Sequence, residues 1–485
     1  MTSTDSIPET AADQTRDRLV LAVLLTASFT LAVDFSILNV ALPVIGADVG
    51  FTLSTLQWIA TSFALCAAGF TLLFGRVADI VGRRRLFLAG IALLGVSSLA
   101  GGLATDPVLL LASRVAQGLA TAAVTPAALS LLTTAFPEGP RRDRALGLNG
   151  ALMAAGFTTG AILGGVVTDL LSWRWAFFIN VVVAVLVLAV APFVLAESRP
   201  ARRPRLDVPG AATVTAGLLA VVFGLTSAGE HSWIDARAWG GLLTGVVLLA
   251  AFWMIEHRVE APLVPVRILR GRGVAWGHVA GVVAFATETS LVFLLTLYLQ
   301  EVLGYTPLAA GLSFAVLGVG TVLGGVLGPK VIASSGSAPR ALALGLAVQA
   351  AATVVLILLG SSSGGVLLLL AATFAGGVAN LVAIVGFMVT VTAGLPDEEQ
   401  GIAAGLATMS QQIGITLGIP VMSAVVGAVL VAPGGSPGGS PGEAAGDILT
   451  AVRTAIGVNA ALCVLTAIAV AVFLRQPRRV RARRG

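Results

Sequence analysis

Three ionisable side chains lie inside long apolar stretches of this sequence, namely Asp34, Arg114 and Glu288. A charged group at the centre of a lipid bilayer costs about 2.5–3.5 kcal/mol on insertion scales, so each of the three needs a physical reason. Carboxylates at such depth bind protons or cations, and a neighbouring arginine favours their ionised form. These residue types therefore predict proton coupling and substrate binding inside a membrane, and no catalytic residue is expected.

Asp34 and Arg114 are predicted to lie at similar depths in the membrane. At a rise of 1.5 Å per residue, Asp34 lies about 22 Å from the inner end of its helix, and Arg114 lies about 10 Å from the outer end of its own. If their two helices are neighbours, Arg114 would keep Asp34 ionised until a proton or a cationic substrate displaces the pairing; a purely structural ion pair is the alternative. Gln117 shares the helix face of Arg114. Asn39 is a further candidate, although interhelical hydrogen bonding would also explain it.

Glu288 stands without a recognisable motif around it. It lies about as far along its helix as Asp34 does. A carboxylate that binds protons or a cationic substrate is the functional interpretation. A residue that faces a wet vestibule is the alternative.

The elements that position these residues are membrane helices. Of the 485 residues, 57% are hydrophobic and 11% charged, whereas soluble domains carry about 25% charged residues. A helix needs roughly 20 apolar residues to cross the hydrocarbon core. Apolar runs of this kind fall at 19–45, 54–74, 86–105, 107–131, 145–169, 175–196, 208–228, 238–256, 273–299, 308–329, 340–360, 365–393, 400–431 and 449–474.

Charges in the loops orient these fourteen helices. Arginines cluster in alternate connections, for example Arg83 to Arg85 and Arg199 to Arg205, and in the tail after residue 474, whereas the opposite connections are almost free of them. Because cytoplasmic loops of membrane proteins are enriched in Lys and Arg, both termini are predicted to be cytoplasmic. The basic residues are explained by this anchoring to the lipid bilayer, and no nucleic-acid partner is expected.

The corner GRVADIVGRRR, residues 75–85, places an acid among arginines and glycines between the second and third runs. Asp79, Arg83 and Arg84 can form a charge cluster that breaks when two bundles rock, and Gly75 and Gly82 permit a tight corner. We predict a cytoplasmic gate here. Simple charge anchoring would explain the arginines but not Asp79 or the glycines.

This corner closely resembles the loop 2–3 signature of the major facilitator superfamily. LAVDFSILNVALP at 31–43, RVAQG at 114–118 and SWRWAFFIN at 172–180 are similar to motifs of its fourteen-helix drug:proton antiporter branch, as are YLQEVLGYTPLAAG at 298–311 and Gln411-Gln412. The resemblance spans nearly the whole chain. It implies alternating access in the bacterial cytoplasmic membrane, export of drugs or antibiotics driven by a proton gradient without a cofactor, and function as a monomer. It also implies that the first and fourth helices meet at the central cavity, so we predict that Asp34 contacts Arg114. The ninth helix would be the first core helix of the second half, so Asp34 and Glu288 are expected to be equivalent across the cavity.

The resemblance also implies a domain organisation of two six-helix bundles with two extra central helices, the all-α major facilitator fold. The expected segments are an N-terminal tail at 1–18, a bundle at 19–196, a linker with two helices at 197–272, a second bundle at 273–474 and a basic tail at 475–485.

The fifth run carries GFTTGAILGG, which is similar to the antiporter motif of that branch. Gly156, Gly160 and Gly164 fall on one helix face suited to close packing, and Gly165 completes the motif. Ala161 replaces the expected proline, so the kink attributed to that proline is in doubt. The motif favours export, and a proton-coupled importer is the alternative.

Other classes of function lack support in the sequence. No G-x-x-x-x-G-K-[ST] phosphate loop occurs, so ATP is not expected to drive transport. A membrane-embedded enzyme would need paired carboxylates or histidines, and the acidic cluster at 397–399 has no matching partner. No metal site is expected. A transporter-like sensor or scaffold is a further alternative, although the charges inside the membrane argue against it.

Overall fold

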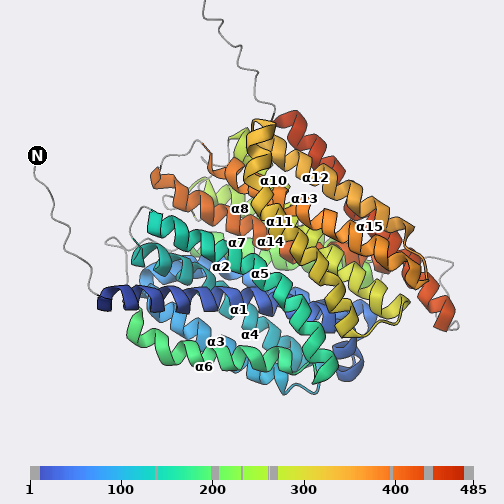
Figure 1. Ribbon diagram of the computed structural model, residues 1–485, viewed down its shortest axis with the longest axis horizontal. Helices are drawn as coiled ribbons and strands as arrows, with labels where there is room; N and C mark the ends of the chain where they lie inside the picture. The colour runs from blue at the N-terminus through green and yellow to red at the C-terminus, as the bar shows by residue number, and fades with distance from the viewer. Residues whose placement is uncertain are drawn as a thin grey trace, which may run out of the picture. The chain divides into compact units, whose positions relative to one another are not determined.

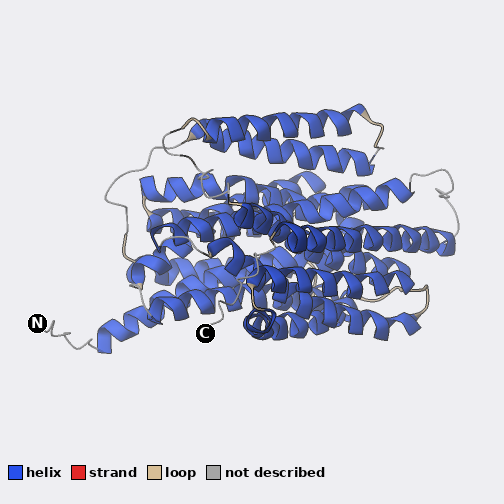
Figure 2. Cartoon of the chain, turned by 90° about the horizontal axis from the view of Figure 1, so that it is seen from above, coloured by secondary structure: helices blue, strands red, loops and turns tan. Residues whose placement is uncertain are grey.

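The computed structural model describes residues 11–136, 140–197, 207–230, 233–259, 262, 271–393, 397–430 and 441–474. These residues are almost entirely helical and contain no strand (Figures 1 and 2). Most of the N-terminal tail, the basic stretch 198–206, the Gly/Ser/Pro-rich stretch 431–440 and the basic tail 475–485 lie outside the described residues.

Fourteen helices of 18 to 39 residues account for this part of the chain, and each coincides with one of the predicted apolar runs. Their bounds are α1 Ala11–Val49, α2 Leu53–Val81, α3 Arg83–Gly102, α4 Pro107–Ala135, α5 Pro140–Leu170, α6 Trp175–Val194, α7 Val208–Glu230, α8 Ala236–Glu256, α10 Arg272–Leu297, α11 Pro307–Ser335, α12 Ala338–Val355, α13 Val366–Thr392, α14 Asp397–Leu430 and α15 Pro441–Phe473.

Most of these helices can cross a bilayer. Twelve of those described are long and apolar enough, and bent α2 makes thirteen if its two parts form one span. The remaining helix, α5, contributes the shorter apolar stretch Ala155–Leu170. The all-α polytopic fold expected from the sequence is confirmed.

The chain divides into two compact units. The first comprises residues 1–52 and 58–215, and the second comprises residues 53–57 and 216–485. The division falls inside α7, whereas the bundle limits at 196 and 273 stay predictions. Each unit is described by itself below.

In the first unit, glycines of α5 allow its backbone to touch that of α1. A Cβ atom at Gly160 would lie 2.7 Å from the Val33 carbonyl oxygen, and one at Gly164 would lie 2.0 Å from that of Ile37. Cβ atoms do not approach carbonyl oxygens so closely, so only glycine fits here. Small residues of this kind are what membrane helices use for close packing, as the spacing of the motif predicted.

The second unit repeats this contact. A Cβ at Gly414 or Gly418 of α14 would lie 2.4 Å from the carbonyl oxygen of Val282 or Ala286 in α10. A Cβ at Gly156 of α5 would lie 2.9 Å from the Phe29 carbonyl oxygen of α1. Gly414 and Gly418 lie 258 residues after Gly156 and Gly160, and the carbonyls of Val282 and Ala286 lie 253 residues after those of Phe29 and Val33. The constant spacing makes α10 the structural equivalent of α1, residue for residue.

The inserted helices also pack through glycines within the second unit. Gly241 of α8 lies against the backbone of Gly224 in α7. A Cβ atom at Gly241 would lie 2.7 Å from the Cα of Gly224. Near the end of α7, Gly229 contacts Gly427 of α14 in the same close manner. These contacts tie α8 to α7 and α7 to α14.

Candidate functional site

The predicted pairing of Asp34 with Arg114 is present in the first unit. Nη1 of Arg114 on α4 lies 3.3 Å from Oδ2 of Asp34 on α1, and each side chain is 1% exposed. A buried ion pair of this kind is stable only when its remaining donors and acceptors are also satisfied.

The rest of the Arg114 guanidinium has partners from two helices. Nε donates to the carbonyl oxygen of Ile59 on α2 at 3.0 Å, and Nη1 donates to Oε1 of Gln117 at 2.8 Å. The guanidinium carbon lies 4.2 Å from the ring centroid of Phe63, in cation–π geometry. Arg114 is thus held between α1 and α2 by polar contacts and by an aromatic face.

Asp34 receives two further donors. Asn180 on α6 donates from Nδ2 to Oδ1 of Asp34. Gln117 donates from Nε2 to the same oxygen at 3.3 Å and to Oγ of Ser98 on α3 at 2.7 Å. Helices α1, α2, α3, α4 and α6 therefore meet at one buried polar cluster, which we call the Asp34 cluster: Asp34, Ser98, Arg114, Gln117 and Asn180.

Two members of this cluster were not predicted as site residues. Asn180 closes the motif SWRWAFFIN, which could have indicated it. Ser98 had no signal, because a serine in an apolar helix is common and usually bonds to its own backbone.

The Asp34 cluster can respond to a proton. An ionised carboxylate only accepts hydrogen bonds, whereas a protonated one must also donate. The three described hydrogen-bond partners of the Asp34 side chain all donate to it. Protonation of Asp34 would therefore remove the charge that balances Arg114 and would place a hydroxyl donor opposite other donors. The arrangement is therefore chemically suited to switch its contacts with protonation.

Asn39 behaves differently from its expected role as an interhelical hydrogen-bonding residue. Its side chain is buried at 1% exposure, yet neither amide atom has a hydrogen-bond partner among the described residues. The structure therefore does not join Asn39 to the Asp34 cluster.

In the second unit, an uncharged cluster stands at the equivalent place. Thr287 of α10 lies 253 residues after Asp34, the spacing obtained when Gly414 and Gly418 are matched to Gly156 and Gly160. Gln349 of α12 donates to Oγ1 of Thr287 at 3.1 Å, and Asn380 of α13 donates to Oε1 of Gln349 at 3.3 Å. Asn459 of α15 donates to the Thr287 carbonyl at 3.0 Å. Neutral groups here replace the carboxylate and the guanidinium.

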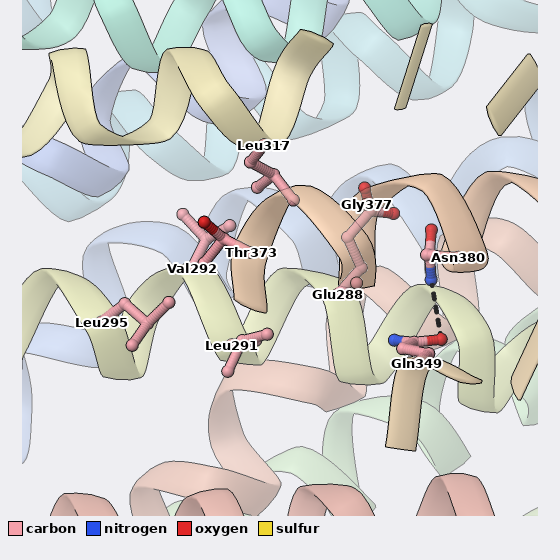
Figure 3. Close-up of a pocket in the computed structure, with 10 residues that line it drawn as sticks. Glu288, Leu291, Val292, Leu295, Leu317, Gln349, Thr373, Gly377 and Asn380 are labelled. Atoms are coloured by element: carbon pink, nitrogen blue, oxygen red, sulfur yellow. Dashed lines mark hydrogen bonds between the residues drawn. The ribbon is translucent and has the colours of Figure 1, made fainter. Parts of the chain in front are cut away.

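Glu288 is therefore not the counterpart of Asp34. It lies one residue further along α10, which turns its side chain by about 100° around the helix axis. The expected equivalence of the two carboxylates is off by one residue. Glu288 instead lines a pocket of the second unit together with Asn380 and Gly377 (Figure 3).

The predicted cytoplasmic gate residues come together at the corner between α2 and α3. Nη2 of Arg83 lies 3.3 Å from Oδ1 of Asp79, and Nη1 donates to Oγ1 of Thr134 on α4 at 2.7 Å. Gly82 adopts φ +117°, a backbone conformation that favours glycine. Gly75 is not crowded, since the nearest atom to its Cβ position is 3.7 Å away.

Glu197 is a member of this corner that the sequence did not reveal. Its Oε1 accepts a hydrogen bond from the backbone N–H of Arg84 at 3.1 Å, and the Arg84 guanidinium donates to the carbonyl of Pro192 on α6. The start of α3 is thereby tied to the end of α6. Glu197 lies 113 residues from Arg84 in the sequence, which explains why no local pattern indicated it.

Other potential sites are accounted for. No group of three or more His, Cys, Asp or Glu residues that could hold a metal ion occurs in the described ranges. Cys66 and Cys463 are buried and unpaired with each other. Nδ1 of His278 lies 2.8 Å from Oγ of Ser410 between α10 and α14, a contact within the packed core of the second unit.

Comparison with known proteins gives the family. Residues 24–419 match the Major Facilitator Superfamily. The cephamycin export protein CmcT of Amycolatopsis lactamdurans is 38% identical over 416 residues, with 83% of each chain covered. The puromycin resistance protein pur8 of Streptomyces alboniger is 34% identical over 408 residues, covering 83% of this chain and 80% of that protein.

Solved structures agree on the fold. A bacterial homologue of the human lysosomal transporter Spinster, in an inward-facing and unoccupied conformation, matches with a TM-score of 0.66 and 18% identity over 96% of this chain and 99% of that one. The nucleoside transporter NupG matches with a TM-score of 0.62 and 12% identity over 94% and 100%. The protein is a multi-pass transporter of the bacterial cytoplasmic membrane and not an enzyme. The chain belongs to the Major Facilitator Superfamily.

Proposed function

We propose that this transporter is a proton-coupled antiporter that exports hydrophobic or cationic small molecules, such as antibiotics, by alternating access. The observation that carries the proposal is the buried Asp34–Arg114 pair, with all polar partners of Asp34 being donors. A charged pair costs desolvation free energy without an assured return in stability, so a coupling role is a reason for its presence.

In the proposed cycle, a proton that enters from outside binds Asp34. The loss of its negative charge frees Arg114 and Gln117 to change partners, and α1 shifts relative to α4 and α6. Asp34 releases the proton to the cytoplasm when the ion pair forms again, and an inward-loaded substrate is carried outward in the opposite step.

The corner around Asp79 would latch the cytoplasmic side while the cavity faces outward. Arg83 bridges Asp79 and Thr134, and Arg84 fastens α3 to the end of α6. These contacts are partly exposed, with side-chain exposures of 21% for Arg83 and 24% for Asp79. Contacts of this type are weak enough to break within a transport cycle.

Relatives support export rather than import. CmcT is named an export protein, and the relatives from Streptomyces alboniger and Streptomyces lincolnensis are named puromycin and lincomycin resistance proteins. Ala161, in place of the expected proline, leaves α5 as a helix without an internal proline. The glycine contact with α1 is present without that proline, so the close packing of α5 on α1 does not depend on a kink.

The test is efflux from proteoliposomes under an imposed pH gradient, with a panel of lipophilic cations and neutral antibiotics. Asp34→Asn is compared with wild type and with Asp48→Asn, a control on the same helix whose carboxylate is 48% exposed and pairs with Arg174. We expect the gradient to drive efflux by wild type and by the control, and Asp34→Asn to abolish it. Gradient-driven efflux by Asp34→Asn at the wild-type rate would refute Asp34 as the coupling residue, and movement of no compound would count against export.

A further inference from the structure

A small pocket in the second unit is lined by a carboxylate and by an amide oxygen. Glu288 of α10 enters it from one side, and Asn380 of α13 lies beside it, with Gly377 one turn away on the same helix (Figure 3). Leu291, Val292 and Leu295 provide an apolar wall along α10.

The Glu288 carboxylate has no hydrogen-bond donor among the residues that the structure describes. No hydrogen bond or ion pair joins it to any residue in the described part of the chain, although the polar groups of Gln349 and Asn380 lie in the same pocket. A carboxylate at membrane depth without a partner is costly. The pocket therefore lacks a positively charged or N–H-bearing group that would complete it.

Asn380 adds a second free acceptor. Its Nδ2 donates to the backbone carbonyl of Ala284 at 3.0 Å, which fixes which end of the amide is the donor. Its Oδ1 is buried and has no hydrogen-bond partner among the described residues, and the side chain is 2% exposed. Together, Glu288 and Asn380 present acceptors that no donor in the described part of the chain satisfies.

The first unit shows what completes the equivalent place. In that unit, Arg114 donates to the backbone carbonyl of Ile59 on α2. Gln117 follows three residues later and donates to Ser98 on α3. In α13, Gly377 touches the backbone carbonyl of Leu317 on α11 and is followed three residues later by Asn380, which bonds to Gln349 on α12. Gly377 thus stands at the position of Arg114, and the resident guanidinium is missing.

The size of the pocket limits what can enter. About 20 Å³ is open to the centre of a water molecule, which is room for roughly one water. An ammonium group is of that size, whereas the body of a drug is not. The apolar wall suits the alkyl carbon atoms that carry such a group.

We propose that Glu288 and Asn380 form a subsite for the primary ammonium group of an exported amine, which supplies the N–H donors that Arg114 supplies in the first unit. This inference rests on the proposed export function and names one chemical class among its substrates. The ammonium group would donate to Glu288 and to Oδ1 of Asn380, and the remainder of the amine would lie outside the pocket.

The test is equilibrium binding of three fluorescent probes to the full-length purified protein in detergent, without a gradient. Dansylcadaverine carries a primary ammonium group at pH 7; its N-acetyl derivative is neutral, and its N-trimethyl derivative keeps the charge but has no N–H donor. We expect dansylcadaverine to bind at least tenfold more tightly than either derivative. Glu288→Gln should remove this preference, while Glu288→Asp, which keeps the charge, should retain part of it.

Glu301→Gln serves as the matched control, because Glu301 is a partly buried carboxylate of the same unit that does not line the pocket. The melting temperature of each variant shows whether it is folded. If Glu288→Gln is folded and binds dansylcadaverine within twofold of wild type, or if the three probes bind equally to wild type, the subsite is refuted. If Glu288→Gln does not fold, the Glu288→Asp comparison and the ranking of the three probes on wild type decide.

The outcomes are separable from those for the proposed function. Amine binding that depends on Glu288, in a protein that shows no gradient-driven efflux, would uphold the subsite and overturn the antiport proposal. Gradient-driven efflux by a protein whose amine binding does not depend on Glu288 would uphold the antiport proposal and overturn the subsite.

Discussion

Nη1 of Arg114 lies 3.3 Å from Oδ2 of Asp34, and neither side chain is more than 1% exposed. Removing one partner of a buried pair leaves an uncompensated charge and costs about 3–5 kcal/mol. We therefore expect Asp34→Ala to lower the melting temperature of the purified protein strongly. The measurement is intrinsic tryptophan fluorescence during heating in detergent.

The double variant Asp34→Asn/Arg114→Gln should recover much of this stability, because two neutral amides need no charge balance. It should remain inactive in gradient-driven efflux. A double variant as unstable as Asp34→Ala would show that the charge balance is not what holds these helices together.

The glycines at the α1–α5 and α10–α14 contacts should tolerate no side chain. Gly164→Ala would place Cβ 2.0 Å from the Ile37 carbonyl, and Gly418→Ala would place it 2.4 Å from that of Ala286. Overpacking typically costs about 1–3 kcal/mol. We expect a lower yield of folded protein for both variants, measured by size-exclusion chromatography. Gly240→Ala is the control, since no atom from a neighbouring described segment lies within 4 Å of its Cβ position; an equal loss there would contradict the packing argument.

A gate role for Asp79 predicts a loss of function without a loss of stability. The Asp79–Arg83 pair is partly exposed, so its contribution to stability should be below about 1 kcal/mol. We expect Asp79→Asn to reduce efflux severalfold while the melting temperature stays near that of wild type. Asp106→Asn is the control, because Asp106 caps α4 at its start and asparagine caps a helix equally well. Unchanged efflux by Asp79→Asn would leave charge anchoring as the role of this corner.

The orientation of the second unit can be tested with two introduced thiols. Ser334 at the end of α11 and Ser362 between α12 and α13 are both exposed, whereas the native Cys66 and Cys463 are buried. With cytoplasmic termini, Ser362→Cys should react with a membrane-impermeant maleimide in intact cells, and Ser334→Cys should react only after lysis. The opposite labelling pattern would show that the termini lie outside the cell.

The helices and the similar depth of Asp34 and Arg114 could be predicted because the bilayer fixes the length of each apolar run, whereas the contact between the two residues was implied by the family resemblance. Depth along two helices is then a simple count of residues, and Asp34 and Arg114 are charged, which makes them conspicuous among apolar neighbours. The glycines of α5 were predictable for a similar reason, since their spacing alone puts them on one face.

The rotation of a helix is harder to infer. Glu288 and Thr287 differ by only 1.5 Å in depth but by about 100° around the axis, so a count of residues could not decide which of them corresponds to Asp34. Ser98 is a neutral residue, and Glu197 lies 113 residues from its partner Arg84, so their contacts arise from tertiary packing alone.

The two buried clusters also differ in how they can be synthesised. Asp34 and Arg114 are 80 residues apart, so at 5–20 residues per second the ribosome delivers the arginine roughly 4–16 s after the carboxylate. Thr287 has no such delay, because its hydroxyl already donates to the carbonyl of Val283 within its own helix at 2.8 Å. We therefore expect the charge of Asp34 to need shelter provided by the membrane insertion machinery during translation, whereas in the second unit the carboxylate of Glu288, and not the neutral Thr287 cluster, makes this demand.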